Sequence, residues 1–145
     1  GLGVAPVSFE ELLRRSDFLS IHTPLLPSPR HMFGAEQCRM MKKEAVLVNT
    51  GRGAVVDQKA LYEALRDGEI AVAGLDVLEF EPPADDDPIF ALDNVITSGH
   101  IAAATTEALI NLRESVAQGV ADVLSGKWPK VLGNPEVKGK VKLAD

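Results

Sequence analysis

Apolar residues along the chain follow two patterns, and the two alternate. Continuous apolar runs bounded by Gly, Pro, Asn or Asp are typical of strands in a covered sheet, and they occupy 17–22, 45–49, 70–78 and 94–98. Apolar residues at helical spacing predict helices at 8–15, 34–44, 58–67 and 105–126. The alternation predicts an α/β fold, a Rossmann-like parallel sheet with flanking helices on both faces.

Residues at the ends of the predicted helices support these assignments. Ser8 and Glu11 form a capping-box pattern, and Asp57 is placed to cap the helix that follows it. Gly68 and Gly126 come directly after two of the helices, where glycine commonly ends a helix. The segment between the third and fourth strands is rich in proline and acidic residues, which predicts mostly loop.

Chemically useful side chains follow several of the predicted strands. Arg52 stands between two glycines after the second strand, Asp76 and Glu81 lie near the end of the third, and His100 follows the fourth. The carboxyl ends of parallel strands meet at the ligand-binding edge of a sheet, so these side chains are expected together. A cation, two carboxylates and an imidazole can bind an acid and transfer a proton. Each also has a structural explanation: a solvated loop arginine, carboxylates that shape turns, and a half-buried histidine at a strand-to-helix joint.

Two other histidines and two glycines belong to the same region. His22 ends the first strand and is the rival candidate for the acid–base role; we assign it a packing role or a place beside a cofactor. His31 lies in a proline-rich loop and is expected to be solvated. Gly51 and Gly53 are expected to allow unusual backbone angles and a close approach of the chain around the arginine between them.

Composition narrows the function classes. The formal net charge is -6 and Lys and Arg form no block, which argues against a nucleic acid partner. No apolar run reaches the roughly 18 residues needed to span a membrane. The single cysteine, Cys38, favours a reducing cytoplasm, and no ligand cluster predicts a metal site.

Two stretches of the chain resemble a known family. Residues 46–83, which begin VLVNTGRG and end LDVLEFEPP, and residues 88–108, which contain GHIAAATT, closely resemble the signature region of the D-isomer-specific 2-hydroxyacid dehydrogenases. This family includes phosphoglycerate, glycerate, hydroxypyruvate, glyoxylate and D-lactate dehydrogenases. The resemblance runs from about residue 3 to residue 126 and implies an NAD- or NADP-dependent oxidoreductase that interconverts a small 2-oxo acid and a D-2-hydroxy acid.

The resemblance implies specific roles for the catalytic candidates. Arg52 would hold the substrate carboxylate and polarise the keto oxygen, a task that suits a planar fork of donors. His100 would be the acid–base group that gives a proton to the carbonyl oxygen. Glu81 would hydrogen-bond to the imidazole, orient it and favour its charged form.

The resemblance also implies a set of cofactor contacts. Asp76 would bind the nicotinamide carboxamide, the Thr50–Gly51 backbone would lie beside the ring, and Thr23–Pro24 would lie near the ribose. The full cofactor set is Thr23, Pro24, Asn49, Thr50, Gly51, Asp76 and His100. The family further implies a homodimer, with the helix at 105–126 covering either another domain or a second subunit.

The sequence departs from the family pattern in three places. It has no G-x-G-x-x-G loop with a downstream acidic residue for the adenosine ribose. Gly99 stands where the family usually has Pro before the histidine, and Pro29 where it usually has Thr. We therefore expect residues 1–103 to be the second half of an NAD-binding domain, residues 104–145 to be a helix and tail returning toward a substrate domain, and the chain alone to be an inactive fragment.

Two alternatives to a dehydrogenase remain at the level of sequence. The same fold serves as a dinucleotide-sensing corepressor-like binding module, whose output is protein association, and fold alone does not separate the two. The other alternative is a catalytically incomplete fragment. The choice of 2-hydroxy acid and the choice between NAD and NADP stay open.

Overall fold

The computed structural model describes residues 3–23 and 30–144. The chain divides into two compact units, residues 1–102 and 103–145. The parallel sheet and the three catalytic candidates lie in the first unit. The sequence placed the boundary after residue 103, and the roles assigned to the two parts stay predictions.

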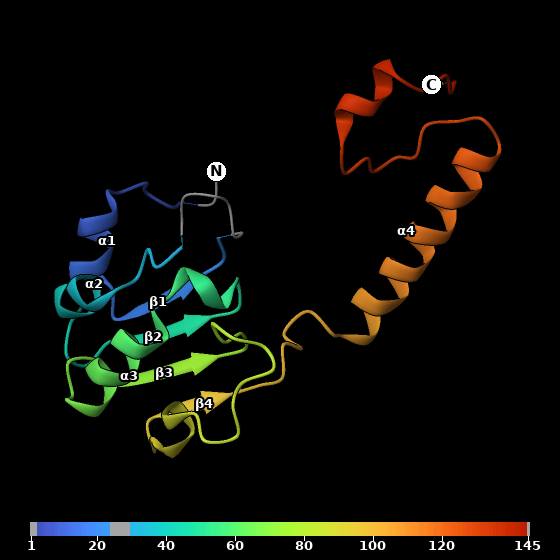
Figure 1. Cartoon of the computed structure of the whole chain (residues 1–145). Coiled ribbons are helices and arrows are strands. Elements are labelled where there is room, and N and C mark those ends of the chain that lie inside the picture. Colours follow the sequence, from blue (N-terminus) through green and yellow to red (C-terminus); the bar gives the residue numbers. More distant parts are fainter. Residues whose placement is uncertain (1–2, 24–29, 145) are drawn as a thin grey trace. The chain divides into compact units, whose positions relative to one another are not determined.

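The first unit is built on a four-stranded parallel sheet in which the strands neighbour one another in chain order (Figure 1). The strands are β1 (Phe18–Ile21), β2 (Val46–Asn49), β3 (Val72–Leu75) and β4 (Val95–Thr97). Leu19 pairs with Leu47, which pairs with Ala73. Because all four strands run in the same direction, the segments that follow them gather at one edge of the sheet.

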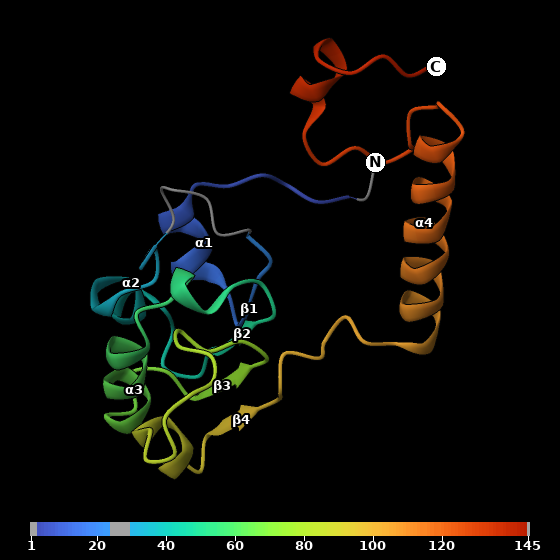
Figure 2. The same ribbon diagram turned by 45° about the vertical axis from the view of Figure 1, so that its right-hand side comes forward.

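Helices α1 (Phe9–Arg15), α2 (Ala35–Met40) and α3 (Gln58–Arg66) all lie on one face of this sheet (Figure 1 and Figure 2). Right-handed connections between strands in chain order place every helix on the same side. The prediction of helices on both faces is therefore wrong for the described part of this unit. On the opposite face, Phe18 and Ile96 are 78% and 72% exposed.

The predicted helix starts are confirmed. The Ser8 hydroxyl accepts from the Glu11 backbone N–H at 3.2 Å, and the Asp57 carboxylate accepts from the Ala60 N–H at 3.0 Å. Helix α2 is shorter than predicted because Met41 adopts an extended conformation and buries its side chain in the core.

Strand β3 is also shorter than its apolar run. Ile70, Val77 and Leu78 lie outside the strand, yet all three side chains are buried. The apolar run from 70 to 78 is therefore longer than the strand because residues just before and just after β3 also bury their side chains. The remaining short elements are the 3₁₀ turns η1 (Gly53–Val55) and η2 (Pro88–Ala91).

The glycines beside Arg52 are required for close approach and not for their backbone angles. Neither Gly51 nor Gly53 has a positive φ, so the prediction of unusual angles is wrong. A Cβ at Gly51 would come within 3.0 Å of the Thr23 carbonyl oxygen, and one at Gly53 within 1.8 Å of the Leu78 carbonyl oxygen. The turn that carries Arg52 thus packs directly on the segment that follows β3.

This contact predicts a large difference between two glycine substitutions. Gly53→Ala should destabilise the protein by about 3 kcal/mol, because the added methyl group forces backbone apart. Gly99→Ala should change stability by less than about 0.5 kcal/mol, since a Cβ there meets nothing within 4 Å. Urea unfolding of both variants tests the pair, and equal midpoints for the two would contradict the packing described.

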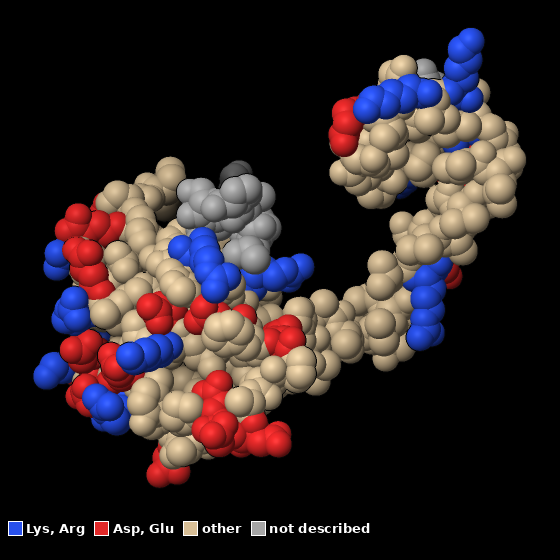
Figure 3. Space-filling view, in the orientation of Figure 1, with Lys and Arg blue, Asp and Glu red and all other residues tan. Residues whose placement is uncertain are grey.

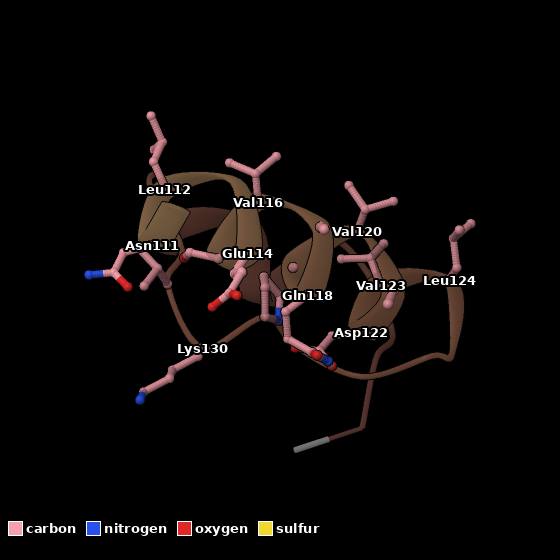
Figure 4. Close-up of a pocket in the computed structure, with 16 residues that line it drawn as sticks. Asn111, Leu112, Glu114, Val116, Gln118, Val120, Asp122, Val123, Leu124 and Lys130 are labelled. Atoms are coloured by element: carbon pink, nitrogen blue, oxygen red, sulfur yellow. The ribbon is translucent and has the colours of Figure 1, made fainter. Parts of the chain in front are cut away.

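The second unit consists mainly of helix α4 (Thr106–Leu124) and a tail with the 3₁₀ turn η3 (Pro135–Gly139). Thr105 caps α4 through a hydrogen bond from the Ala108 N–H at 3.1 Å. A groove lies between α4 and residues 129–131, where Leu112 and Val116 point to one side of the helix and Glu114 to the other (Figure 4). No residue of α4 is buried within the described chain. The helix therefore carries an apolar stripe that the described residues leave open.

Candidate active site

The turn after β2 presents Arg52 to solvent. Asn49 is buried at the end of the strand, with 1% of its surface exposed. Its side-chain oxygen accepts from the Gly51 N–H at 3.0 Å, and its amide nitrogen donates to the Arg52 carbonyl at 3.2 Å. These two hydrogen bonds tie the backbone of the turn to the last residue of β2. Asn49 therefore has a structural role in this turn, and its predicted contact with the cofactor stays a prediction. The Arg52 guanidinium donates to the Gly51 carbonyl at 2.8 Å.

Glu81 and His100 form a hydrogen-bonded pair. The Nδ1 atom of His100 lies 2.8 Å from one Glu81 oxygen, while the other oxygen accepts from the Leu78 backbone N–H at 3.1 Å. Both side chains are partly exposed. The hydrogen bond from His100 lowers the pKa of Glu81, so the carboxylate is ionised at neutral pH. One imidazole nitrogen is thus held by a fixed anion, and Nε2 is left for proton transfer.

Asp76 holds the loop that carries His100. Its carboxylate accepts from the Ser98 hydroxyl at 2.6 Å and from the backbone N–H groups of Ile101 and Ala102 at 2.8 and 3.0 Å. The Asp76 carbonyl also accepts from the His100 N–H at 2.9 Å. The backbone of His100 has a positive φ of 57°, which is uncommon for a residue other than glycine and is stabilised here by these contacts. The predicted contact of Asp76 with a nicotinamide stays a prediction.

The bond from Ser98 predicts a pH-dependent loss of stability. The Ser98 hydroxyl is the largest cause that lowers the pKa of Asp76. A lowered pKa contributes stability that is present above the unfolded value of about 4 and is lost as pH falls through the folded value. Ser98→Ala should therefore cost about 2 kcal/mol at pH 7, and the difference from wild type should shrink below pH 4.

A neutral hydroxyl bond supplies the control for this prediction. The Ser16 hydroxyl donates to the Leu12 carbonyl at 2.7 Å, with no carboxylate involved. Ser16→Ala should cost about 1 kcal/mol at every pH. Chemical unfolding between pH 3 and pH 7 measures both variants. A pH-independent cost for Ser98→Ala would contradict the role given to the Asp76 carboxylate.

The loops after β1 and β2 meet through His22. Its Nε2 lies 2.8 Å from the Ser20 hydroxyl, and its Nδ1 lies 3.2 Å from the Thr50 hydroxyl. His22 is therefore held beside a predicted cofactor residue and away from the Glu81–His100 pair. Thr23 is exposed next to it. Pro24 lies outside the described residues, as does Pro29.

The structure brings part of the predicted set into one cavity. A cavity of about 390 Å³ is lined by Asp76, Glu81 and His100 together with apolar side chains that include Leu78 and Phe90. Arg52 does not line this cavity. The turn that carries Arg52 nevertheless packs, through Gly53, against the backbone of Leu78, which does line it.

Sequence reasoning missed two features near this site. Ser98 is a partner of Asp76, and only its position at the end of β4 could have indicated it. His31 is exposed, as predicted, but its Nε2 also lies 2.6 Å from a carboxylate oxygen of Glu79, a contact that the sequence did not predict. The two residues are distant in sequence, and the pattern around His31 gives no sign of this partner.

The described residues also bear on three other possibilities: a metal site, a basic nucleic-acid-binding surface and a membrane span. Within the described residues, no three His, Cys, Asp or Glu side chains are placed to hold a metal ion. On the face shown in Figure 3, Lys and Arg are interspersed with Asp and Glu over the first unit. No helix among the described residues is long and apolar enough to span a membrane.

The first unit matches a known family over its whole length. Residues 1–102 match the model of the D-isomer specific 2-hydroxyacid dehydrogenase, NAD binding domain. The chain belongs to this family.

Individual members of the dehydrogenase family are similar over most of the chain. It is 51% identical over 136 residues to the glyoxylate reductase of Korarchaeum cryptofilum, covering 94% of this chain and 41% of that protein. It is 46% identical to the D-3-phosphoglycerate dehydrogenase of Methanocaldococcus jannaschii, covering 91% of this chain and 26% of that protein. The crystal structure of D-lactate dehydrogenase with NAD+ from Lactobacillus jensenii superposes with a TM-score of 0.82 at 35% identity, covering 88% of this chain and 42% of that one. The chain thus spans less than half the length of each.

Proposed function

We propose that this chain contributes the acid–base side of the active site of an NAD-dependent oxidoreductase that interconverts a small 2-oxo acid and a D-2-hydroxy acid. The Glu81–His100 pair, with its bond of 2.8 Å, carries the proposal within a chain of this family. Arg52, on a neighbouring loop at the same edge of the sheet, supplies the cation that a carboxylate substrate requires.

Each side chain has a separate task in the proposed reaction. Arg52 binds the substrate carboxylate with its guanidinium fork and places the keto group for reduction. His100 gives its proton from Nε2 to the carbonyl oxygen during reduction and takes it back during oxidation. Glu81 holds Nδ1 and stabilises the imidazolium form. The nicotinamide cofactor supplies or accepts the hydride.

The residues around the site fit the nicotinamide end of such a cofactor. Thr23 and Thr50 present hydroxyl groups at the ends of β1 and β2, and neither side chain is buried. Gly51 lets the backbone after β2 lie against the Thr23 carbonyl. Asp76 has two acceptor oxygens and three donors from its own chain, which leaves capacity for one more donor such as a carboxamide N–H. We assign NAD, with NADP as the alternative that the experiment below distinguishes.

The proposal extends to assembly and location. The open apolar stripe of α4, which includes Leu112, Val116 and Val120, supports contact with another domain or with a second subunit of a homodimer. The single cysteine, Cys38, is buried and unpaired in the described chain, which supports a cytoplasmic location.

Turnover measurements on the full-length protein test the proposal. Glyoxylate, hydroxypyruvate and pyruvate are supplied in turn with NADH or NADPH, and absorbance at the nicotinamide band is followed. Steady oxidation of one cofactor with one of the acids is expected. Saturable NADH binding in a calorimeter without turnover of any acid would favour a dinucleotide-sensing binding module instead. If the protein neither bound NADH nor turned over any acid, it would be catalytically incomplete.

A further inference from the structure

Glu79 is a nearly buried carboxylate that accepts hydrogen bonds from three residues. Only 8% of its side chain is exposed. One oxygen accepts from Arg30 at 3.2 Å and from the His31 Nε2 at 2.6 Å. The other accepts from the Gln58 backbone N–H at 3.2 Å. A buried carboxylate is tolerated when donors surround it in this way.

These partners belong to separate segments of the first unit. Arg30 and His31 precede α2, whereas Gln58 is the first residue of α3. The connection between Glu79 and Gln58 is reciprocal, because the Glu79 N–H donates to the Gln58 side-chain oxygen at 2.9 Å. Glu79 therefore ties the segment after β3 to the start of α3 and to the loop before α2.

Each tied segment leads to a catalytic candidate within a few residues. The His31 N–H donates to the Ala54 carbonyl at 2.9 Å, two residues after Arg52. The Leu78 N–H, next to Glu79, donates to the carboxylate of Glu81 at 3.1 Å. The Arg52 turn also packs against the Leu78 carbonyl through its following glycine. Through these neighbours, the Glu79 carboxylate is connected both to the turn after β2 that carries Arg52 and to the segment after β3 that carries Glu81.

We propose that Glu79 is a positioning residue that fixes the Arg52 turn relative to the Glu81–His100 pair. It touches neither substrate nor cofactor in this assignment and acts only through its neighbours. The kinetic consequence rests on the proposed function, whereas the structural coupling between the segments does not.

The role requires an acceptor-only side chain. Replacement by glutamine keeps the volume but turns one acceptor oxygen into an NH₂ donor. That donor faces either the Gln58 N–H or the Arg30 and His31 donors, so one side of the connection is lost. Aspartate keeps both acceptors on a shorter stem and should restore part of the connection.

Hydrogen exchange tests the coupling without any need for activity. In the full-length protein, Glu79→Gln should speed amide exchange together at residues 30–33, 53–58 and 78–82, with Glu79→Asp intermediate between Glu79→Gln and wild type. Glu63→Gln, an exposed carboxylate on α3, is the matched control and should leave all three segments unchanged. Faster exchange confined to the start of α3 would overturn the proposal.

Kinetics test the consequence for the reaction. Glu79→Gln should lower kcat/KM for the 2-oxo acid by about 100-fold, because small displacements of catalytic groups have effects of this size. The KM for the cofactor should stay within twofold of wild type. In an Arg52→Lys background, the same Glu79→Gln change should cost less than about threefold, since the positioned group is already altered.

The outcomes separate the two proposals. Equal losses from Glu79→Gln in the wild-type and Arg52→Lys backgrounds would mean that Glu79 acts through general stability, which overturns the positioning role. A wild-type protein that turns over no 2-oxo acid would overturn the proposed function, and the exchange experiment would still decide the coupling.

Discussion

Replacing Arg52 with alanine is expected to lower kcat/KM for the 2-oxo acid by about 1,000-fold in the full-length protein. A bidentate pair with a carboxylate contains two charge-assisted hydrogen bonds, each of which contributes about 2 kcal/mol. Losing both removes about 4 kcal/mol of transition-state binding, which corresponds to this factor. Arg52→Lys should lose about 50-fold, because an ammonium group keeps the charge but not the planar fork.

Steady-state kinetics with varied acid and saturating cofactor measure this effect. Arg66 provides the matched control, because it is exposed on α3 and pairs with its neighbour Asp67. Arg66→Ala should leave kcat/KM within twofold of wild type. If Arg52→Ala also stayed within twofold, Arg52 would be a solvated loop residue and its assignment to the substrate would be wrong.

Replacing His100 with alanine is expected to lower kcat by about 1,000-fold, within the range usual for a general acid–base group. Glu81→Gln should have a smaller effect, about 30-fold, because the imidazole remains but loses the anion that favours its charged form. In wild type, reduction of the 2-oxo acid should decline at low pH as the pH falls through the pKa of Glu81, which the hydrogen bond from His100 lowers, because the protonated carboxyl no longer holds the ring as an anion. Glu81→Gln should lack this decline, since its amide does not titrate.

The pH dependence of kcat for both variants checks these assignments. Glu79 is unsuitable as the control carboxylate because of its own network, and Glu63→Gln serves instead. An unchanged pH profile in Glu81→Gln would show that the pair seen here does not operate in catalysis. Retained activity in His100→Ala would move the acid–base role to another residue, with His22 as the first to examine.

The sequence predicted the elements well where local patterns determine them. The helix starts at Ser8 and Asp57 were predicted because capping is a contact between residues three positions apart. The four strands were predicted because each is a short apolar run. The pairing of Glu81 with His100 was expected only through the family resemblance, since neither spacing nor composition joins residues that are 19 positions apart.

The features that the sequence did not predict depend on the spatial order of the strands. Because the strands neighbour one another in chain order, α1, α2 and α3 lie on one face of the sheet (Figure 1), and a continuous apolar run such as 70–78 looks the same whichever order the strands adopt. The contact between His31 and Glu79 likewise depends on which loops meet, and 48 residues separate its two partners. The close approach at Gly53 was anticipated, but the atom it approaches was visible only in the structure.

The position of the unit boundary has a consequence for what holds the site together. Arg52, Glu81 and His100 all precede residue 102, where the first compact unit ends. The hydrogen bonds that hold Glu81 and His100 are likewise made by residues of this first unit. Substitutions in residues 103–145 should therefore leave the proton-transfer pair assembled, whatever they do to the second unit.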